Sequence, residues 1–121
     1  MKYILTLLLT SMILLSCKNE KQHNEISDNN LASKIEYGEA MVNKVVFEGN
    51  YKMILFALKK GQDLKPHSAP MDAPMVMLNG SAKVTIGDKE IIAYEGDIIT
   101  LPKDIDHGVY PITDCKFLLM K

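Results

Sequence analysis

Two histidines and a nearby carboxylate are the residues whose types and spacing could bind a metal ion. His67 ends the segment GQDLKPH, His107 ends the segment GDIITLPKDIDH, and Asp72 lies shortly after the first histidine. Imidazole and carboxylate groups are common ligands of Zn²⁺ and Fe²⁺, and two histidines with one carboxylate form the ligand set of non-haem iron oxygenases. These three residues therefore predict a candidate divalent-metal site, provided that the fold brings them together.

Short strands joined by turns are the elements that must position these residues. Apolar and polar residues alternate along the segments, as in SAKVTI (81–86), and Gly, Asn and Asp separate one segment from the next. Asn79-Gly80 predicts a type I′ hairpin, since both central residues of that turn need positive φ. The pattern predicts an all-β fold, an antiparallel sandwich or barrel. About eight strands are expected, at residues 42–48, 51–59, 74–78, 81–86, 89–94, 97–101, 106–112 and 115–120.

The two histidine segments resemble the two motifs of the cupin superfamily, which in full read G-x5-H-x-H-x3,4-E-x6-G and G-x5-P-x-G-x2-H-x3-N. His67 matches the first histidine of these motifs and His107 matches the last one. The resemblance covers about residues 50–120 and implies a small antiparallel jelly-roll barrel whose interior holds the site. Turn and strand-end positions of the motifs are also kept, at Gly61, Gly80, Gly96 and Pro102.

Other motif positions carry different residues, and this removes metal ligands. Ala69 stands where the family has its second histidine, and Ala73 stands where it has the glutamate. Two imidazoles remain, whereas protein sites for Zn²⁺ use three or four protein ligands. Asp72 is the candidate third ligand if the segment before Pro74 is irregular and turns it inward, so the cofactor prediction is either none or a divalent metal (Fe, Mn or Zn). The remaining departures are Asp104, in place of glycine, and Pro111, in place of asparagine.

Without a metal, the barrel interior would be an apolar pocket with the two imidazoles as polar anchors, the usual make-up of a small-molecule site. Methionine side chains are expected to fill such an interior as adaptable packing groups. The alternative is a Cu(I) site built from His, Met and the thiol of Cys115, because copper(I) prefers soft ligands. We expect Cys115 to be a small core residue instead. The predicted pocket lining is Met75, Met77, Val84, Val109 and Phe117.

The N-terminus has the features of a secretory signal: Lys2, an uninterrupted apolar run, and small residues before Cys17. The segment LLSC resembles the bacterial lipobox, which implies that Cys17 becomes the lipidated first residue of the mature chain. The expected organisation is a lipoprotein signal peptide (1–16), a lipidated N-terminus with a flexible, disordered polar tether (17–33), and a cupin barrel (34–121). The predicted location is the bacterial cell envelope, with the protein anchored in a membrane and facing the periplasm or the exterior.

Composition argues against nucleic acid as a partner, since all 14 basic residues are lysines and the net charge is −1. Three functions remain open. The first is a lipid-anchored cupin-domain protein that binds a small molecule without strong catalysis, and the second is a metal-dependent oxygenase or isomerase using His67, His107 and Asp72. The third is assembly, because residues 52–58 are apolar on both faces, which suits either a covering N-terminal segment or a homodimer interface. The sequence assigns neither catalytic residues nor the ligand.

Overall fold

The computed structural model describes residues 29–121 and contains nine strands, most of them in the segments with period-two alternation. A short 3₁₀ helix precedes them, and its Asn30 side chain caps it by accepting a hydrogen bond from the Ala32 N–H. The elements are η1 (Leu31–Lys34), β1 (Val42–Glu48), β2 (Lys52–Leu58), β3 (Leu64–His67), β4 (Ala73–Asn79), β5 (Ala82–Ile86), β6 (Lys89–Ala93), β7 (Ile98–Leu101), β8 (His107–Pro111) and β9 (Cys115–Met120).

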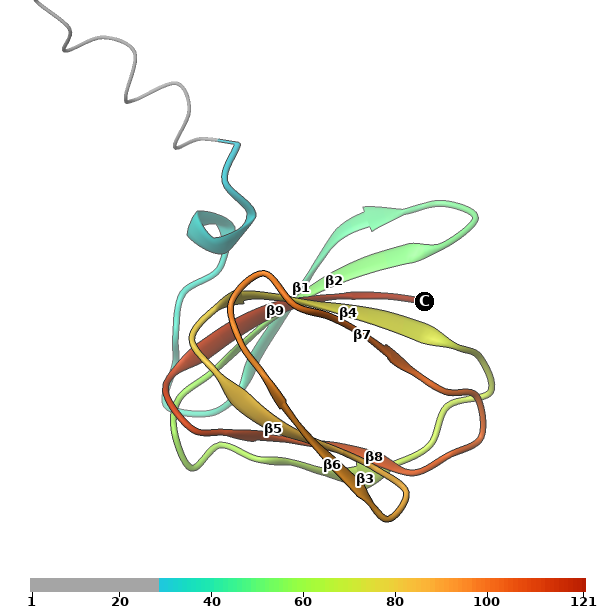
Figure 1. Cartoon of the computed structure of the whole chain (residues 1–121). Helices are drawn as coiled ribbons and strands as arrows, with labels where there is room; N and C mark the ends of the chain where they lie inside the picture. Colours follow the sequence, from blue (N-terminus) through green and yellow to red (C-terminus); the bar gives the residue numbers. More distant parts are fainter. Residues whose placement is uncertain (1–28) are drawn as a thin grey trace, which may run out of the picture.

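All strand pairs are antiparallel, and the strands form two sheets that face each other (Figure 1). One sheet has the order β1-β2-β9-β4-β7 and the other has the order β3-β8-β5-β6. Consecutive strands are repeatedly assigned to different sheets, the double-sheet arrangement of a jelly roll. The predicted all-β jelly-roll class is therefore confirmed.

The ninth strand, β3, is the one that the alternation did not predict. It has four residues, and Pro66 lies inside it next to two polar or charged neighbours, Lys65 and His67. Proline removes a ladder donor and is confined to sheet edges or irregular positions. β3 is indeed the edge strand of its sheet, and its register with β8 shifts between Leu64 and His67. This short strand matters because it carries one of the two candidate histidines.

The Asn79-Gly80 turn has the predicted glycine conformation but joins two different sheets. β4 pairs with β7 and β9, whereas β5 pairs with β6 and β8, so the turn is a corner and the predicted hairpin is wrong. Gly80 has the positive φ, +73°, that the turn needs. Asn79 does not, because Asp104 is the only non-glycine residue with positive φ within residues 29–121. A type I′ turn, which needs positive φ at both central residues, is therefore not formed.

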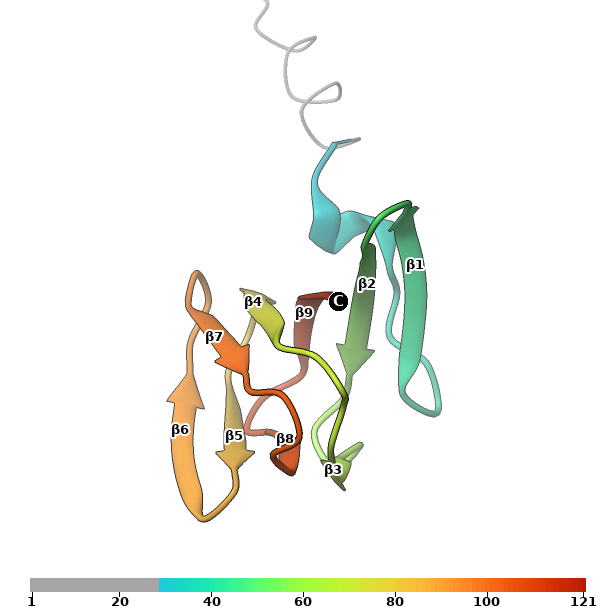
Figure 2. The ribbon, with the colours of Figure 1, turned by 90° about the vertical axis from the view of Figure 1, so that its right-hand side faces the viewer.

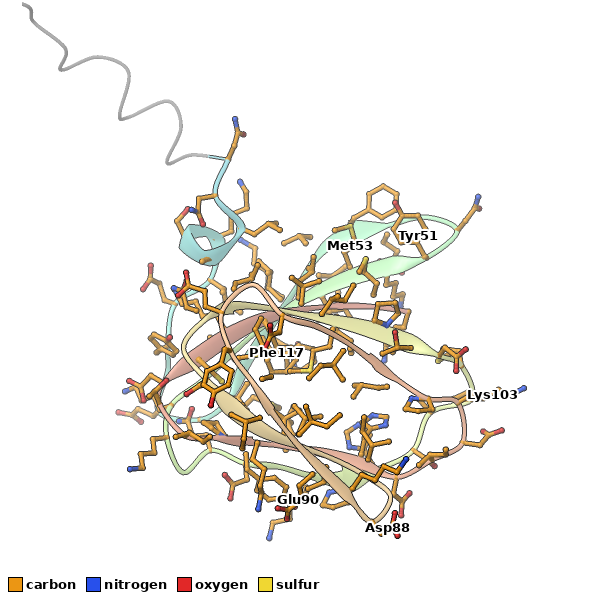
Figure 3. All side chains as sticks on the ribbon, viewed as in Figure 1. Tyr51, Met53, Asp88, Glu90, Lys103 and Phe117 are labelled. Atoms are coloured by element: carbon orange, nitrogen blue, oxygen red, sulfur yellow. The ribbon has the colours of Figure 1, made fainter. Side chains whose placement is uncertain are left out.

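The core lies between the two sheets, where Phe117 is buried (Figure 3). Inward-facing side chains of β9 and β4 meet there with those of β5 and β8, as alternation along strands requires. The buried members of this core are Leu58, Ala73, Met75, Met77, Ala82, Val84, Ala93, Leu101, Val109, Cys115 and Phe117.

The N-terminal segment covers part of the outer face of the five-stranded sheet. Leu55 and Ala57 of β2 point to that face and are fully buried, together with Ile35 from the segment after η1. Lys116 of β9 is only 7% exposed; its Nζ donates a hydrogen bond to the Ala32 carbonyl at 2.7 Å. The covering segment accounts for the two-sided apolar character of β2, and the homodimer interface stays a prediction. Other side chains that pack there are Leu31, Tyr37, Val42, Val46, Met53, Val76, Leu78 and Leu118.

The predicted signal peptide and the lipidation site at Cys17 lie outside the described residues. Of the predicted tether, residues 29–33 are described, and Leu31 packs against the outer face of the sheet. Within residues 29–121, no helix has the length and apolar character needed to cross a membrane. Figure 2 shows that this N-terminal segment approaches the domain beside β1 and β2, at one end of the five-stranded sheet.

Candidate functional site

His67 and His107 meet at the opening of the barrel because β3 and β8 are neighbouring antiparallel strands. The two residues are cross-strand partners in the β-ladder. Their ring centroids lie 4.7 Å apart, and the rings are inclined at 64°, in an edge-to-face arrangement. β5 supports the pair from the other side of β8, where Ile86 is the partner of His107. The structure therefore brings together the two histidines that the motifs single out.

The hydrogen bonds of the two rings fix their tautomers. Nδ1 of His67 lies 3.0 Å from the Lys65 carbonyl oxygen, and Nδ1 of His107 lies 3.2 Å from the Ile105 carbonyl oxygen. A carbonyl oxygen can only accept a hydrogen bond, so Nδ1 must carry the proton in each ring. In a neutral imidazole the other nitrogen then has a lone pair. Both rings consequently keep Nε2 as an acceptor.

An apolar cavity of about 80 Å³ adjoins the two rings. His107 is buried, with 5% of its surface exposed, whereas His67 is exposed and lies at the opening. Two phenylalanine rings, Phe56 and Phe117, stack in the cavity wall with centroids 4.9 Å apart and an angle of 11° between their planes. The complete lining is Phe56, Leu64, His67, Leu101, His107, Val109, Phe117 and Leu119.

The cavity uses part of the predicted lining. Val109 and Phe117 line it as expected. Met75, Met77 and Val84 lie in the same core, where at most 1% of each residue is exposed, but they are not among the lining residues. These three side chains therefore act as packing groups behind the cavity wall.

The remaining lining residues were not predicted. Leu119 lies two residues after Phe117 on β9 and shares its inward face, so alternation was sufficient to find it. Phe56 lies on β2, which is apolar on both faces, so period two could not show which of its faces points inward. Phe56 is the cross-strand partner of Phe117, and this pairing settles its direction. Leu64 lies on the unpredicted strand β3. Phe56 could have been identified by pairing β2 with β9, because this pairing places it opposite Phe117.

Asp72 is engaged away from the two histidines. Its Oδ1 accepts a hydrogen bond from the Lys103 backbone N–H at 2.7 Å, and the neighbouring Ala69 carbonyl accepts one from the Asp104 N–H at 2.8 Å. These bonds join the β3–β4 loop to the β7–β8 loop, at the end of the barrel marked by Lys103 in Figure 3. Asp72 thus has a structural partner in the place where the sequence suggested a metal ligand.

The donor groups present do not fit the metal that the cupin motifs imply. No group of three or more His, Cys, Asp or Glu side chains that could hold an ion occurs within residues 29–121. The two imidazoles of His67 and His107 lie together at the cavity, whereas zinc and iron sites use three or four protein ligands. The positions of the other family ligands are occupied by Ala69 and Ala73, which have no lone pair to offer.

Asp104 shows why the second cupin motif has glycine at this position. Its φ is +59°, a left-handed conformation that glycine adopts freely and that aspartate tolerates better than most residues. The chain therefore keeps the backbone geometry of the motif although the residue has changed. This conformation allows the Asp104 N–H to reach the Ala69 carbonyl and connect the two loops.

Cys115 behaves as a core residue. It is a free cysteine with no exposed surface. Burial, with a smaller contribution from Asp114, raises the pKa of its thiol to about 11, so the thiol is protonated at neutral pH. The thiolate is the form that acts as a nucleophile or metal ligand. The buried, protonated thiol of Cys115 is therefore not activated as a nucleophile.

Burial lowers the pKa of His107 below its ordinary value of 6.5, and the neighbouring His67 acts in the same direction. The bond to the Ile105 carbonyl and the charge of Asp106 act in the opposite direction but are outweighed. The folded protein therefore binds a proton at His107 less readily than the unfolded chain does. As pH falls below about 6.5, the unfolded chain takes up more protons, and the free energy of unfolding must decrease.

We expect this decrease to be smaller in His107→Phe, whose side chain cannot titrate. The measurement is urea unfolding of both proteins at a series of pH values between neutral and mildly acidic. The difference between the two pH profiles isolates the contribution of His107 from that of the carboxylates, which titrate in both proteins. Parallel profiles would show that folding does not depress the basicity of this ring.

Comparison with solved structures identifies the family of this fold. The structure resembles an RmlC-like cupin protein from Desulfovibrio desulfuricans, with 31% identity, a TM-score of 0.68, and coverage of 75% of this chain and 91% of that one. A cupin 2 conserved barrel domain protein from Leptotrichia buccalis is 34% identical, with a TM-score of 0.71, over 75% of this chain and 45% of that one.

A third neighbour, a cupin superfamily protein from Desulfitobacterium hafniense, shares the fold at 21% identity, with a TM-score of 0.72 over 76% of this chain and 86% of that one. No protein-family model and no curated protein matches the chain. The paired histidines between two facing sheets and the neighbour from D. desulfuricans lead to the same assignment. The chain belongs to the cupin superfamily.

Proposed function

We propose that this protein is a lipid-anchored cupin-domain protein of the bacterial cell envelope that binds a small molecule in its barrel without strong catalysis. The observation that carries the proposal is the pair of imidazoles at the opening of an apolar cavity. Apolar walls with a few convergent polar groups are the usual composition of small-molecule sites. The ligand would contact the side chains directly, with no metal between them.

The two imidazoles of the cavity lack the partners that would complete a metal site or activate a nucleophile within residues 29–121. His67 and His107 are its only titratable lining residues, and each uses Nδ1 to bond a backbone carbonyl. Asp72, the carboxylate that follows the first histidine in the sequence, accepts a hydrogen bond from the Lys103 backbone N–H. Neither a third metal ligand nor a nucleophile with an activating base adjoins the two rings in the described part of the chain. Binding is therefore the activity that these residues support best.

The anchor would leave the cavity accessible. The lipobox-like segment before Cys17 supports lipidation, and the tether reaches the domain at η1, which packs over the outer face of the five-stranded sheet. The cavity lies between the sheets. The first residue of its lining along the chain is Phe56, so the segment before β1 does not line it. A ligand could therefore enter from the periplasm or the exterior while the protein stays on the membrane.

Labelled fatty acid should be incorporated into the wild-type protein but not into Cys17→Ser. Equal labelling of the two proteins would refute the lipid anchor.

The binding proposal is tested by chemical analysis of the protein as purified, without a chelator, from cells that secrete the Cys17→Ser chain. We expect little bound metal and a small organic molecule in the extract, found by elemental analysis and mass spectrometry respectively. His67→Ala should lose the molecule, whereas Lys89→Ala, at an exposed position of the β5–β6 hairpin, should retain it.

One metal ion per chain, lost on replacing either histidine, would favour the alternative function. The protein would then be a metal-dependent oxygenase or isomerase that completes its ligand set by a rearrangement of the β3–β4 loop. An extract without any molecule that depends on His67 would argue against the binding function itself.

A further inference from the structure

The histidine pair offers hydrogen-bond acceptors to the cavity and no donors. In both rings the proton is on Nδ1 and points to a backbone carbonyl, at Lys65 for His67 and at Ile105 for His107. In both cases the carbonyl belongs to the residue two positions before the histidine, so the same hydrogen bond is formed twice. What remains for a ligand is the Nε2 lone pair of each ring.

The rest of the lining cannot supply a donor through its side chains. Apart from the histidines it consists of two phenylalanines, three leucines and one valine. A ligand that enters must therefore pair with Nε2 through its own O–H or N–H group. The requirement is strongest at His107, which is 5% exposed, because an acceptor that loses water without gaining a partner is destabilised.

The size and walls of the cavity restrict the ligand further. Its volume of about 80 Å³ is smaller than the engineered cavity of about 150 Å³ that binds benzene. The cavity is open near the exposed His67, so one ring could enter it in part. The stacked rings of Phe56 and Phe117 present an aromatic surface against which a flat ring can pack.

We propose that this pocket selects small, uncharged, largely apolar ring compounds that donate a hydrogen bond, the class to which phenol belongs. This inference rests on the proposed binding function and adds the chemical class of the ligand. An aryl ether of similar shape has no donor and would leave the Nε2 atoms unpaired. An aryl carboxylate is an acceptor, and the Nδ1–H of each ring is already donated to a backbone carbonyl.

The test is calorimetric titration of the EDTA-treated Cys17→Ser mature chain (17–121) with phenol, anisole and benzoate. We expect phenol to bind, anisole to bind about tenfold more weakly because of the missing hydrogen bond, and benzoate to bind more weakly still. This comparison uses the wild-type pocket, so it does not depend on whether a variant folds.

Variants then locate the acceptor. His107→Phe keeps a ring of similar size but has no lone pair, and we expect its preference for phenol over anisole to fall well below that of the wild type, because only the exposed His67 acceptor remains. Lys89→Ala, the exposed control, should keep the tenfold preference stated for the wild-type pocket. Thermal unfolding monitored by circular dichroism verifies that each variant is folded.

Each other outcome overturns the inference. If anisole binds as tightly as phenol, or benzoate binds more tightly, the donor requirement is wrong although the pocket still binds small molecules. If none of the three probes binds the wild-type protein, the ligand class is wrong. The binding function itself then fails only if no organic molecule that depends on His67 is extracted from the purified protein.

Discussion

Replacing Phe117 with alanine is expected to lower the free energy of unfolding by about 3–5 kcal/mol. Phe117 is 1% exposed and lies on β9, which is bordered by β2 on one side and β4 on the other. Its ring stacks on Phe56 and forms part of the cavity wall. Truncation removes buried surface and enlarges a cavity that already exists, so the neighbouring strands have little freedom to close the space.

Phe47→Ala is the matched control for Phe117→Ala. Phe47 is the same residue type but is 43% exposed on the edge strand β1, where its ring contacts Tyr51. We expect a loss of about 1 kcal/mol or less, since exposed positions contribute little to stability. Urea unfolding of both variants measures the difference. Equal losses would show that Phe117 is not part of the tightly packed interior.

Replacing Gly80 with alanine is expected to destabilise the fold by about 3 kcal/mol or more. A methyl group here would overlap the Asp114 carbonyl oxygen and would lie 2.7 Å from Thr113 Oγ1. The corner cannot move away easily, because the Ser81 carbonyl accepts hydrogen bonds from the Ile112 and Thr113 N–H groups and the Ser81 N–H donates one to Thr113 Oγ1. The positive φ of Gly80, +73°, adds a backbone penalty for any residue with a side chain.

Gly61→Ala separates these two contributions. Gly61 also has positive φ, +91°, but a methyl group there would meet no atom within 4 Å. We expect it to lose about 1–2 kcal/mol, the backbone term alone. Chemical denaturation of both variants gives the comparison. A loss at Gly61 as large as that at Gly80 would mean that close approach to Asp114 does not determine the requirement for glycine.

The fold class was predictable because most strands alternate clearly and are bounded by Gly, Asn and Asp. What alternation could not provide was the assignment of strands to sheets. Asn79-Gly80 has the composition of a hairpin turn, yet it connects two sheets. Its close approach to Asp114 involves residues far apart in the chain, and local sequence patterns do not report such contacts. β3 escaped prediction because a four-residue edge strand with a central proline carries little periodic signal.

The candidate site was predictable in part. Motif spacing singled out His67 and His107, and the structure places the two rings together. The direction of Asp72 could not be predicted, since it depends on how the β3–β4 loop bonds to the Lys103 backbone. The tautomers of the two rings depend in the same way on backbone carbonyls that only the folded chain places within reach.

The proposed ligand class depends on two imidazoles that converge over the cavity with both Nε2 atoms unprotonated and available to a ligand. Nitrogen NMR of isotope-labelled histidine side chains in the EDTA-treated protein measures this directly, with His67→Phe and His107→Phe supplying the assignments. We expect both rings to carry their proton on Nδ1, their ring protons to lie close to each other, and phenol to shift both Nε2 resonances. Protons on Nε2, or two rings without any mutual proximity, would contradict it.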